Sequence, residues 1–276
     1  MSTPNSFDTN ALVNQVAVVT GAAGGLGLSI CEQLKQMGAT VVMVDVSYGE
    51  TPEESEQGIQ VQCDIGNPDA VAKMGQFVQT RFGRCDVLVN NAGISQRSPA
   101  IDTDLSVYQR IVDVDLLAPI ALTQALLGHL VSNGHGQIVM ISSVAGKAGI
   151  PMRTAYCAAK HGLIGYADAL RSEVAGQGVK VLVVAPGSVR TNVSRNALNA
   201  DGTVRGTSDA AIDNGIDPDI VATTIWDAVD AGKREIVIAE GMEAGIPVLR
   251  AQDPEKLFDM VEAMVADGYA QKIAAR

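Results

Sequence analysis

The chain has 276 residues, of which 47% are hydrophobic and 18% charged, a composition typical of one globular domain and unlike that of a disordered or fibrous chain. At this length a fold buries about three-quarters of its unfolded surface, so its stability requires neither disulfides nor a metal. The net charge of −11 repels nucleic-acid phosphates and anionic lipid, so we expect neither nucleic acid nor a membrane as a partner.

The N-terminal segment and the cysteines indicate the cellular compartment. Residues 1–20 contain no Lys or Arg, and Asn14 and Gln15 interrupt the apolar stretch, so we expect neither a secretory signal nor a transit peptide. No later run approaches the ~20 apolar residues that a membrane helix requires. The four cysteines lie far apart without a CxxC pair, which favours buried free thiols. We therefore predict a cytoplasmic protein.

Seven short apolar, β-branched segments alternate with longer helical patterns. The predicted strands span 15–20, 40–46, 58–62, 86–90, 137–142, 179–185 and 235–239. They lack polar/apolar alternation, which indicates strands buried on both faces, and the stretches between them suit crossover helices. The pattern predicts an α/β fold of the Rossmann type, with a doubly wound parallel sheet of seven strands.

The whole chain, 1–276, is expected to form a single dinucleotide-binding and catalytic domain with its core at about 15–240. The polar, Gly/Asn/Asp-rich segment 192–217 has few apolar anchors and is predicted to be a mobile loop over the substrate. The stretch 241–276 is predicted to form two or three short helices that extend beyond the sheet and cover either the active site or a subunit interface.

The first predicted strand runs into the sequence TGAAGGLG at 20–27, and a helical pattern over 26–37 follows. Gly21 permits a tight turn, Gly25 lets the main chain approach a pyrophosphate, and Gly27 allows close contact between helix and strand. The free N–H groups at the helix start would face the anion. A turn that only needs flexible residues is the alternative, and the spacing departs from the G-x-G-x-x-G form.

Acidic residues follow the second and third predicted strands. Asp45 stands about twenty residues after the glycines, where a carboxylate accepts both hydroxyls of an adenosine ribose. A 2′-phosphate would be repelled there, and neither Ala23 nor Val46 supplies a cation to bind it, so NAD is favoured over NADP. A solvated aspartate at a strand end is the alternative. Asp64, followed by Ile65, either accepts from the adenine amino group or begins a turn.

Five motifs together resemble the short-chain dehydrogenase/reductase family. They are the glycine loop, NNAG at 90–93, Ser143, Tyr156-x-x-x-Lys160, and Pro-Gly at 186–187 followed by Thr191. Each is weak alone, but all five occur in the family's order across about 15–239. The resemblance implies an NAD-dependent oxidoreductase that interconverts a secondary alcohol and a ketone. Segments 146–147 and 190–197 are also similar to the branch containing the dehydrogenase/reductase member seven carbonyl reductases, whose substrates include steroids and retinoids.

The catalytic chemistry is expected from a tyrosine and a lysine. Tyr156 and Lys160 are four residues apart in a predicted helix over 154–175, so they lie on one face. A lone tyrosine, with an ordinary pKa of about 10, is a poor base near neutral pH, but an ammonium and a positive nicotinamide ring stabilise phenolate. Tyr156 would exchange the proton of the substrate hydroxyl. Ser143, thirteen residues earlier, would hold the substrate oxygen, with Ser142 as the near competitor.

The resemblance extends to the cofactor contacts. Lys160 would also bind the nicotinamide ribose, and Thr191 the carboxamide, with the Val189 main chain beside it. The full set of expected cofactor residues is Gly21, Gly25, Leu26, Gly27, Asp45, Asp64, Ile65, Asn90, Ala92, Gly93, Tyr156, Lys160, Pro186, Gly187, Val189 and Thr191. The three histidines do not form a site, and no metal is expected.

One position departs from the family pattern. Asp115 stands where the family usually has an Asn that helps hold a water linking the catalytic lysine to solvent. An ionised aspartate accepts but cannot donate, which alters such a proton relay. We hypothesise that Asp115 pairs with Lys160, raises the pKa of the lysine and weakens its effect on Tyr156. The alternative function is a weakly active or inactive NADH-binding sensor on the same fold.

The resemblance also implies self-association. Family members are commonly homodimers or homotetramers that meet through the helices predicted here at 105–130 and 154–175. The expected partners are therefore a small alcohol or ketone substrate and further copies of this chain.

Overall fold

The computed structural model of the chain describes residues 12–269 and 271. The expectation that the chain begins with no leader rests largely on residues 1–11, which lie outside the described residues.

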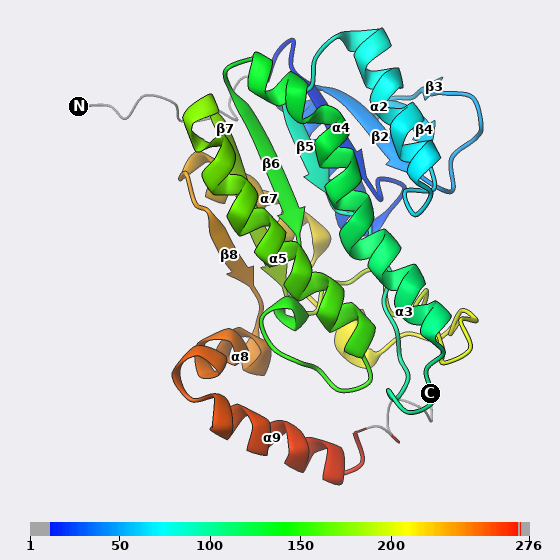
Figure 1. The fold of residues 1–276 in the computed structure, drawn as a ribbon, viewed down its shortest axis with the longest axis vertical. Coiled ribbons are helices and arrows are strands. Elements are labelled where there is room, and N and C mark those ends of the chain that lie inside the picture. The colour runs from blue at the N-terminus through cyan, green and yellow to red at the C-terminus, as the bar shows by residue number, and fades with distance from the viewer. Residues whose placement is uncertain (1–11, 270, 272–276) are drawn as a thin grey trace.

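All seven predicted strands form and lie side by side in one parallel sheet (Figure 1). They are β1 (Val16–Thr20), β2 (Thr40–Asp45), β4 (Ile59–Gln62), β5 (Val87–Asn90), β6 (Gly136–Ile141), β7 (Val179–Pro186) and β8 (Glu235–Ile238). The predicted number is one strand short, because β3 (Glu53–Glu54) pairs antiparallel with β4 at the sheet edge. Two exposed glutamates carry no apolar pattern from which a strand is predicted.

The strand order is β3-β4-β2-β1-β5-β6-β7-β8. The chain thus winds outward in one direction from β1 to β4 and in the other from β5 to β8. Val18 pairs with Val42 on one side and with Leu88 on the other, so β1 and β5 lie together at the reversal point. In open α/β sheets ligands bind at this point, beyond the carboxyl ends of the strands.

Helices cover both faces of the sheet, as its continuously apolar strands require. The pair α1 (Gly25–Gln36) and α7 (Pro218–Asp230) covers one face. The helices α2 (Pro68–Phe82), α4 (Ala118–Ser132) and α5 (Thr154–Val174) cover the other, which faces the viewer in Figure 1. Successive strand residues alternate between the two cores: Val19 packs with the first pair and Val18 with the second group.

The predicted helix over 105–130 is interrupted. It forms as α3 (Leu105–Val112), a π-helical turn at Asp113–Leu117, and α4. The run Leu105–Ser132 is long and apolar enough to span a membrane by length and hydropathy, which the sequence interpretation missed. Its apolar residues include Leu122, Leu126 and Leu130, all buried in the core cluster between the sheet and the neighbouring helices, as in a core helix.

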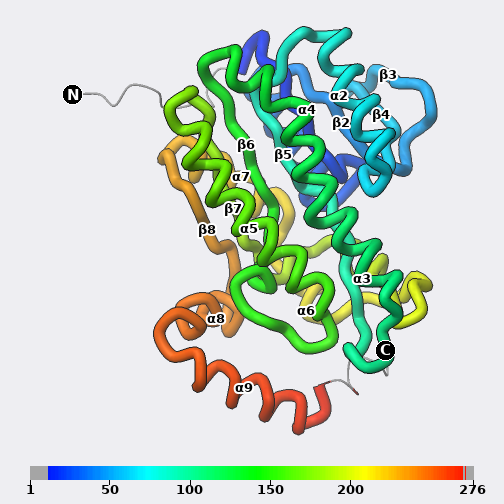
Figure 2. The backbone as a smooth tube through the Cα atoms, viewed as in Figure 1, coloured from blue at the N-terminus to red at the C-terminus, as the bar shows by residue number. Residues whose placement is uncertain are grey.

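Two segments lie beyond the carboxyl ends of the strands. The segment 192–217 contains the short helix α6 (Ala210–Asp213), and the C-terminal stretch forms α8 (Gly241–Gln252) and α9 (Pro254–Ala266), confirming the prediction of two or three helices. Figure 2 shows α6, α8 and α9 gathered below the same end of the sheet. Two short 3₁₀ turns, Val144–Gly146 and Ala175–Gln177, complete the described elements.

Candidate active site

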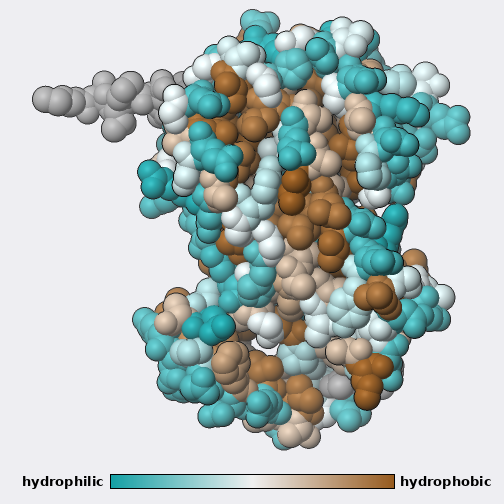
Figure 3. All heavy atoms as spheres, viewed as in Figure 1, coloured by the Kyte–Doolittle hydropathy of each residue, from teal (hydrophilic) through white to brown (hydrophobic). Residues whose placement is uncertain are grey.

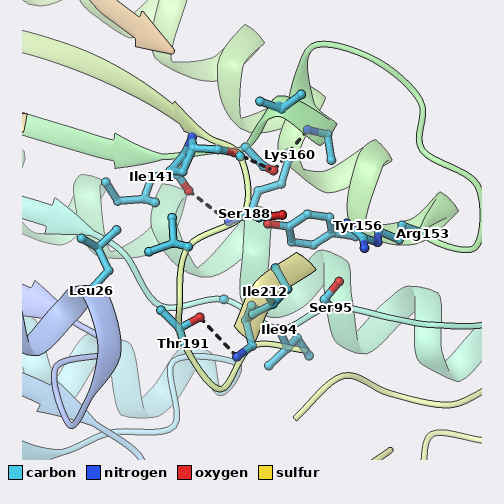
Figure 4. A pocket seen from close by; sticks show the side chains of 18 of the residues that line it. Leu26, Ile94, Ser95, Ile141, Arg153, Tyr156, Lys160, Ser188, Thr191 and Ile212 are labelled. Carbon is cyan, nitrogen blue, oxygen red and sulfur yellow. Dashed lines mark hydrogen bonds between the residues drawn. The ribbon is translucent and has the colours of Figure 1, made fainter. Parts of the chain in front are cut away.

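Most of the predicted site residues line one cavity of about 850 Å³ at the carboxyl ends of the strands. Its wall contains Gly21, Gly25, Leu26, Gly27, Asp45, Ala92, Gly93, Ser143, Tyr156, Lys160, Pro186, Gly187, Val189 and Thr191. Four predicted residues stand outside the wall: Asp64, Ile65, Asn90 and Asp115. Figure 4 shows Leu26 and Thr191 at one end of this pocket and Tyr156 with Arg153 at the other.

The glycine loop has the geometry expected from its sequence. Gly21 and Gly25 adopt φ values of +67° and +54°, a region that favours glycine. A Cβ on Gly27 would lie 2.0 Å from the main-chain oxygen of Gly21, so only glycine allows α1 to begin this close to the strand end. The roles predicted for Gly21 and Gly27 in shaping this loop are confirmed.

The N-terminus of α1 has the features of an anion-binding site. Among the described residues, no side chain caps the helix at Gly24, and its first turn carries no acidic residue. The first N–H groups of a helix have no partner within the helix, and the helix dipole adds positive charge there. The cavity wall follows this loop, so the residues present fit a pyrophosphate.

Asp45 ends β2 at the same side of the cavity. Its Oδ2 accepts the Ala23 N–H at 3.2 Å, and its Oδ1 accepts from both the N–H and the hydroxyl of Ser47, at 3.0 and 2.8 Å. These bonds hold the carboxylate beside the glycine loop. Neither Ala23, Val46 nor Ser47, which line the wall around it, is a cation.

Asp64 and Ile65 lie outside the cavity wall. The Asp64 main-chain oxygen accepts the Asn67 N–H at 3.0 Å, and its carboxylate accepts the Gly66 N–H at 3.0 Å and lies 3.4 Å from Arg110. Asp64 therefore begins a turn, one of the two alternatives open from the sequence. Its contact with adenine stays a prediction.

The two asparagines after β5 have different positions. The Asn90 side chain is buried and donates to Thr123 Oγ1 at 3.1 Å, so it points into the core. Asn91 instead lines the cavity and donates to the main-chain oxygens of Thr20 and Gly21, at 2.9 and 3.2 Å. Sequence interpretation missed this structural role of Asn91, although the doubled asparagine at a strand end was visible.

The structure favours Ser143 over Ser142 for contact with a substrate. Ser142 Oγ is buried and donates to the main-chain oxygen of Lys160 at 3.0 Å, which fixes α5 against β6. Ser143 Oγ lines the cavity, accepts the Ala145 N–H at 3.1 Å and donates to the Pro186 oxygen at a long 3.3 Å. Its proton is therefore easily redirected to another acceptor.

Tyr156 and Lys160 project into the cavity from the same face of α5, as their spacing predicts. Lys160 Nζ lies 5.6 Å from the centre of the Tyr156 ring and donates to the Ile141 main-chain oxygen at 3.0 Å (Figure 4). The Lys160 ammonium therefore lies beside the Tyr156 ring.

Asp115 lies behind Lys160 and forms the predicted ion pair. Its Oδ2 is 3.2 Å from Lys160 Nζ, its Oδ1 accepts the Ile94 N–H at 2.8 Å, and its side chain is fully buried. Burial lowers the pKa of Lys160, but the Asp115 carboxylate together with Tyr156 outweighs burial and raises that pKa above its ordinary value. The predicted ion pair is confirmed, and the pKa of Lys160 shifts in the predicted direction. The predicted weaker effect of Lys160 on Tyr156 stays a prediction.

The π-helical turn explains how Asp115 reaches this position. Asp115 is the central residue of Asp113–Leu117, where the wider turn interrupts the regular α-helix between α3 and α4. A Cβ on Gly93 would lie 3.0 Å from Asp115 Oδ2 and 3.2 Å from Lys160 Nζ, so the glycine leaves room for the pair. The NNAG motif thus leaves space for the Asp115–Lys160 pair and also forms part of the cavity wall.

The loop after β7 is held by the C-terminal extension. The Ser188 N–H and hydroxyl donate to the two oxygens of Glu243 in α8, at 2.6 and 2.9 Å. Thr191 follows in the same loop and lines the cavity close to Gly25. Sequence interpretation missed Glu243, because its partner lies 55 residues earlier.

The segment 192–217 has more anchors than its composition suggests. Asp209 is buried and accepts from Arg97 Nε at 2.7 Å and from Arg205 Nη1 at 2.6 Å. Its N–H donates to the buried Ser194 hydroxyl at 2.8 Å. The expectation of few apolar anchors is confirmed, but charged and polar side chains fix the segment as well. Its buried apolar residues are Ala197, Ile212 and Ile216. Its mobility stays a prediction.

The C-terminal extension forms one wall of the cavity. Met242 and Ile246 of α8 and Met260, Val261 and Met264 of α9 all line it. The structure thus places the extension over the candidate active site, one of the two sequence alternatives, and a role in a subunit interface stays a prediction. Methionine walls are apolar and adaptable in shape.

Comparison with known proteins identifies the family. The family model described as short chain dehydrogenase matches residues 15–202. The chain therefore belongs to the short-chain dehydrogenase/reductase family, as its motifs predict, and is an oxidoreductase by that membership.

The relatives refine this placement. The chain is 35% identical to the Bos taurus protein named dehydrogenase/reductase SDR family member 7B, across 90% of this chain and 80% of that protein. The solved structure of a metagenomic short-chain oxidoreductase in complex with NADP is 29% identical, with a TM-score of 0.67, covering 85% and 100% of the two chains. A short-chain dehydrogenase/reductase from Burkholderia phymatum in complex with NAD shares the fold, with a TM-score of 0.77 at 21% identity and coverage of 88% and 95%. The predicted likeness to the member seven branch is thus confirmed.

Proposed function

We propose that the chain is an NAD(H)-dependent oxidoreductase that interconverts a secondary alcohol and a ketone, with Ser143, Tyr156 and Lys160 as its catalytic residues. The observation that carries the proposal is that these three side chains line one cavity with the glycine loop and Asp45. A nicotinamide dinucleotide supplies or accepts the hydride when bound.

Each of the three side chains has a distinct task in this proposal. Tyr156 takes the substrate hydroxyl proton during alcohol oxidation and returns it during ketone reduction. Lys160 keeps its positive charge near the tyrosine ring and so favours phenolate. Ser143 donates its hydroxyl proton to the substrate oxygen, in place of its long bond to the Pro186 oxygen.

The choice of NAD over NADP rests on Asp45. Its carboxylate lines the cavity beside the α1 N-terminus, and Ala23, Val46 and Ser47 beside it offer no positive charge. A 2′-phosphate at this point would meet like charge without a compensating Arg or Lys. Similar solved structures hold NADP in one case and NAD in another, which supports a nicotinamide dinucleotide and leaves the choice to this local chemistry.

Tyr156→Phe tests the catalytic assignment. NADH formation is followed with NAD and a panel of aliphatic and steroid secondary alcohols, and each reaction is repeated with NADP. We expect the variant to bind NADH normally and to lose turnover by a factor of at least ~10², as for the loss of a general acid–base group. Tyr166→Phe, on the same helix but outside the cavity wall, is the matched control. Near-native turnover by Tyr156→Phe would refute the assignment.

Asp115 is the observation that favours a second candidate, a sensor that binds NADH without turnover. Its carboxylate stands where the family usually has asparagine, and its pairing with Lys160 offsets part of the positive charge that favours phenolate. Tight NADH binding by the wild-type chain, without turnover of any alcohol in the panel, would favour this function.

We propose further that the chain is cytoplasmic and self-associates through α4 and α5 as a dimer or tetramer. Figure 3 shows apolar side chains gathered on the surface between these two helices. Leu117, at the start of α4, is 50% exposed although it is a large apolar residue. Sedimentation of the wild type beside Leu117→Glu measures the association, and a wild-type monomer at micromolar concentration would contradict it.

A further inference from the structure

Two guanidinium groups, those of Arg97 and Arg153, line the cavity on the side away from the glycine loop. The other cation in the wall, Lys160, is paired with Asp115. The carboxylate of Glu243 is occupied by the two hydrogen bonds from Ser188. Arg97 and Arg153 share the carboxylate of Asp209 with Arg205, so this end of the wall carries an excess of positive charge.

The two arginines differ in how well their hydrogen bonds are satisfied. Arg97 is 2% exposed, and it donates to Asp209 at 2.7 Å and to Ser95 Oγ and the Gln96 oxygen at 2.8 Å each. Its contact with Asp209 helps to fix the segment 192–217. Arg97 is accordingly a structural residue of the cavity wall.

Of the three arginines that contact Asp209, Arg153 has the longest distance to its carboxylate. Its Nη2 lies 3.4 Å from Asp209 Oδ2, the same oxygen that Arg97 engages at 2.7 Å. Its Nε is buried and has no hydrogen-bond partner among the described residues, whereas the side chain as a whole is 19% exposed and lines the cavity, so its outer nitrogens are the ones that a ligand can reach. A buried donor without an acceptor is costly, and most such donors in proteins find a partner. A guanidinium group presents several donors in one plane, which match a carboxylate.

The position of Arg153 connects this group to the reaction site. Arg153 precedes Tyr156 by three residues at the start of α5, and both side chains belong to the pocket drawn in Figure 4. The wall contributed by the C-terminal extension is apolar, with Met242, Met260 and Met264. A molecule that fits both surfaces has an apolar body and one anionic end.

We propose that Arg153 binds a carboxylate of the substrate, and that the enzyme acts on hydroxy or oxo acids with an alkyl chain. The reaction itself rests on the proposed function: the carbinol carbon loses a hydride to NAD while its hydroxyl proton passes to Tyr156. Arg153 contacts the carboxylate only and determines specificity, and the methionine wall contacts the alkyl chain.

Binding of two unreactive probes tests the carboxylate site without requiring turnover. Octanoate and octanamide have the same chain and differ in charge. Calorimetric titration into the full chain with NADH is expected to show octanoate binding about 10- to 100-fold more tightly, as for charge-assisted hydrogen bonds. Arg153→Gln is expected to reduce this preference to less than about 3-fold. Arg81→Gln, a change in an exposed arginine of α2 that is paired with Glu54, is expected to keep it.

The outcomes separate this proposal from the reaction. Equal affinity of the wild type for both probes, or an unchanged preference in Arg153→Gln, overturns the carboxylate site. Arg153→Lys keeps the charge but not the planar group, and an intermediate preference in it supports the site if the Gln variant does not fold. Turnover of 3-hydroxyoctanoate and its amide is measured separately. If neither compound is turned over while the preference for octanoate remains, the proposed reaction is refuted and the carboxylate site is still supported.

Discussion

Asp115→Asn removes the negative charge behind Lys160 with little change of shape. The two atoms of the pair lie 3.2 Å apart, and the side chains of Lys160 and Asp115 are 4% and 0% exposed. Breaking such a buried pair by removing one partner costs about 3–5 kcal/mol. Asparagine still offers an oxygen to the Ile94 N–H, so we expect a loss near the lower limit, about 3 kcal/mol. At about 2–4 °C per kcal/mol for a large domain, the melting temperature falls by about 6–12 °C.

The same variant is expected to move the pH profile of alcohol oxidation to lower pH. Loss of the carboxylate favours phenolate at Tyr156 and lets Lys160 release its proton more readily, because the Asp115 carboxylate contributes to the raised pKa of the lysine. Calorimetry and initial rates between pH 6 and 10 measure the two effects. Asp113→Asn, two residues away and only half-buried, is the matched control and is expected to change stability by less than about 1 kcal/mol.

Burial raises the pKa of Asp115 itself and so favours its neutral, protonated form, which would not form an ion pair with Lys160. If Asp115→Asn leaves both the melting temperature and the pH profile unchanged, Asp115 carries a proton in the native protein. The electrostatic pair with Lys160 would then be refuted.

Three further changes test other parts of the structure. Gly27→Ala places a Cβ 2.0 Å from the Gly21 oxygen and is expected to weaken NADH binding, followed by NADH fluorescence, by more than about tenfold. Gly49→Ala, with open space around the new Cβ and outside the cavity wall, should not. Hydrogen bonds from two arginines outweigh burial and hold the pKa of Asp209 well below its usual range, so its stabilisation is complete above about pH 4 and is lost as the pH falls further. Urea unfolding at pH 5 and pH 3 should show a smaller acid loss in Asp209→Asn, and an equal loss would contradict this. Glu243→Gln loses the charge that holds the loop after β7, and we expect faster tryptic cleavage within α8–α9 and a higher KM; unchanged cleavage would show that this contact does not hold the extension.

The regular part of the fold was predictable because its signals are local. Buried parallel strands leave continuous apolar runs, and glycines at a strand end mark positions where a side chain has no room, as at Gly27. The tyrosine and lysine are four residues apart, so helix geometry alone brings them to one face. The Asp115–Lys160 pair followed from one substitution in a recognisable motif.

The parts that could not be predicted depend on distant contacts or on small backbone changes. The bond between Ser188 and Glu243 joins residues 55 positions apart, and no local pattern encodes it. The π-helical turn at Asp113–Leu117 differs from an α-helix by a shift in hydrogen bonding that residue types do not reveal. The buried charges around Asp209 lie in a segment whose polar composition is also typical of an open loop.

The C-terminal extension supplies much of the substrate wall but contributes little to the core. Among the described residues, α8 contains no buried side chain and α9 contains only Leu257. The side chains proposed as catalytic, by contrast, stand at the end of β6 and on α5, whose apolar faces belong to the main core. Such a division lets selection exchange the extension among relatives without disturbing the reaction chemistry. New substrate ranges can therefore arise in this lineage by recombination or drift in its last thirty or so residues, at little cost in folding.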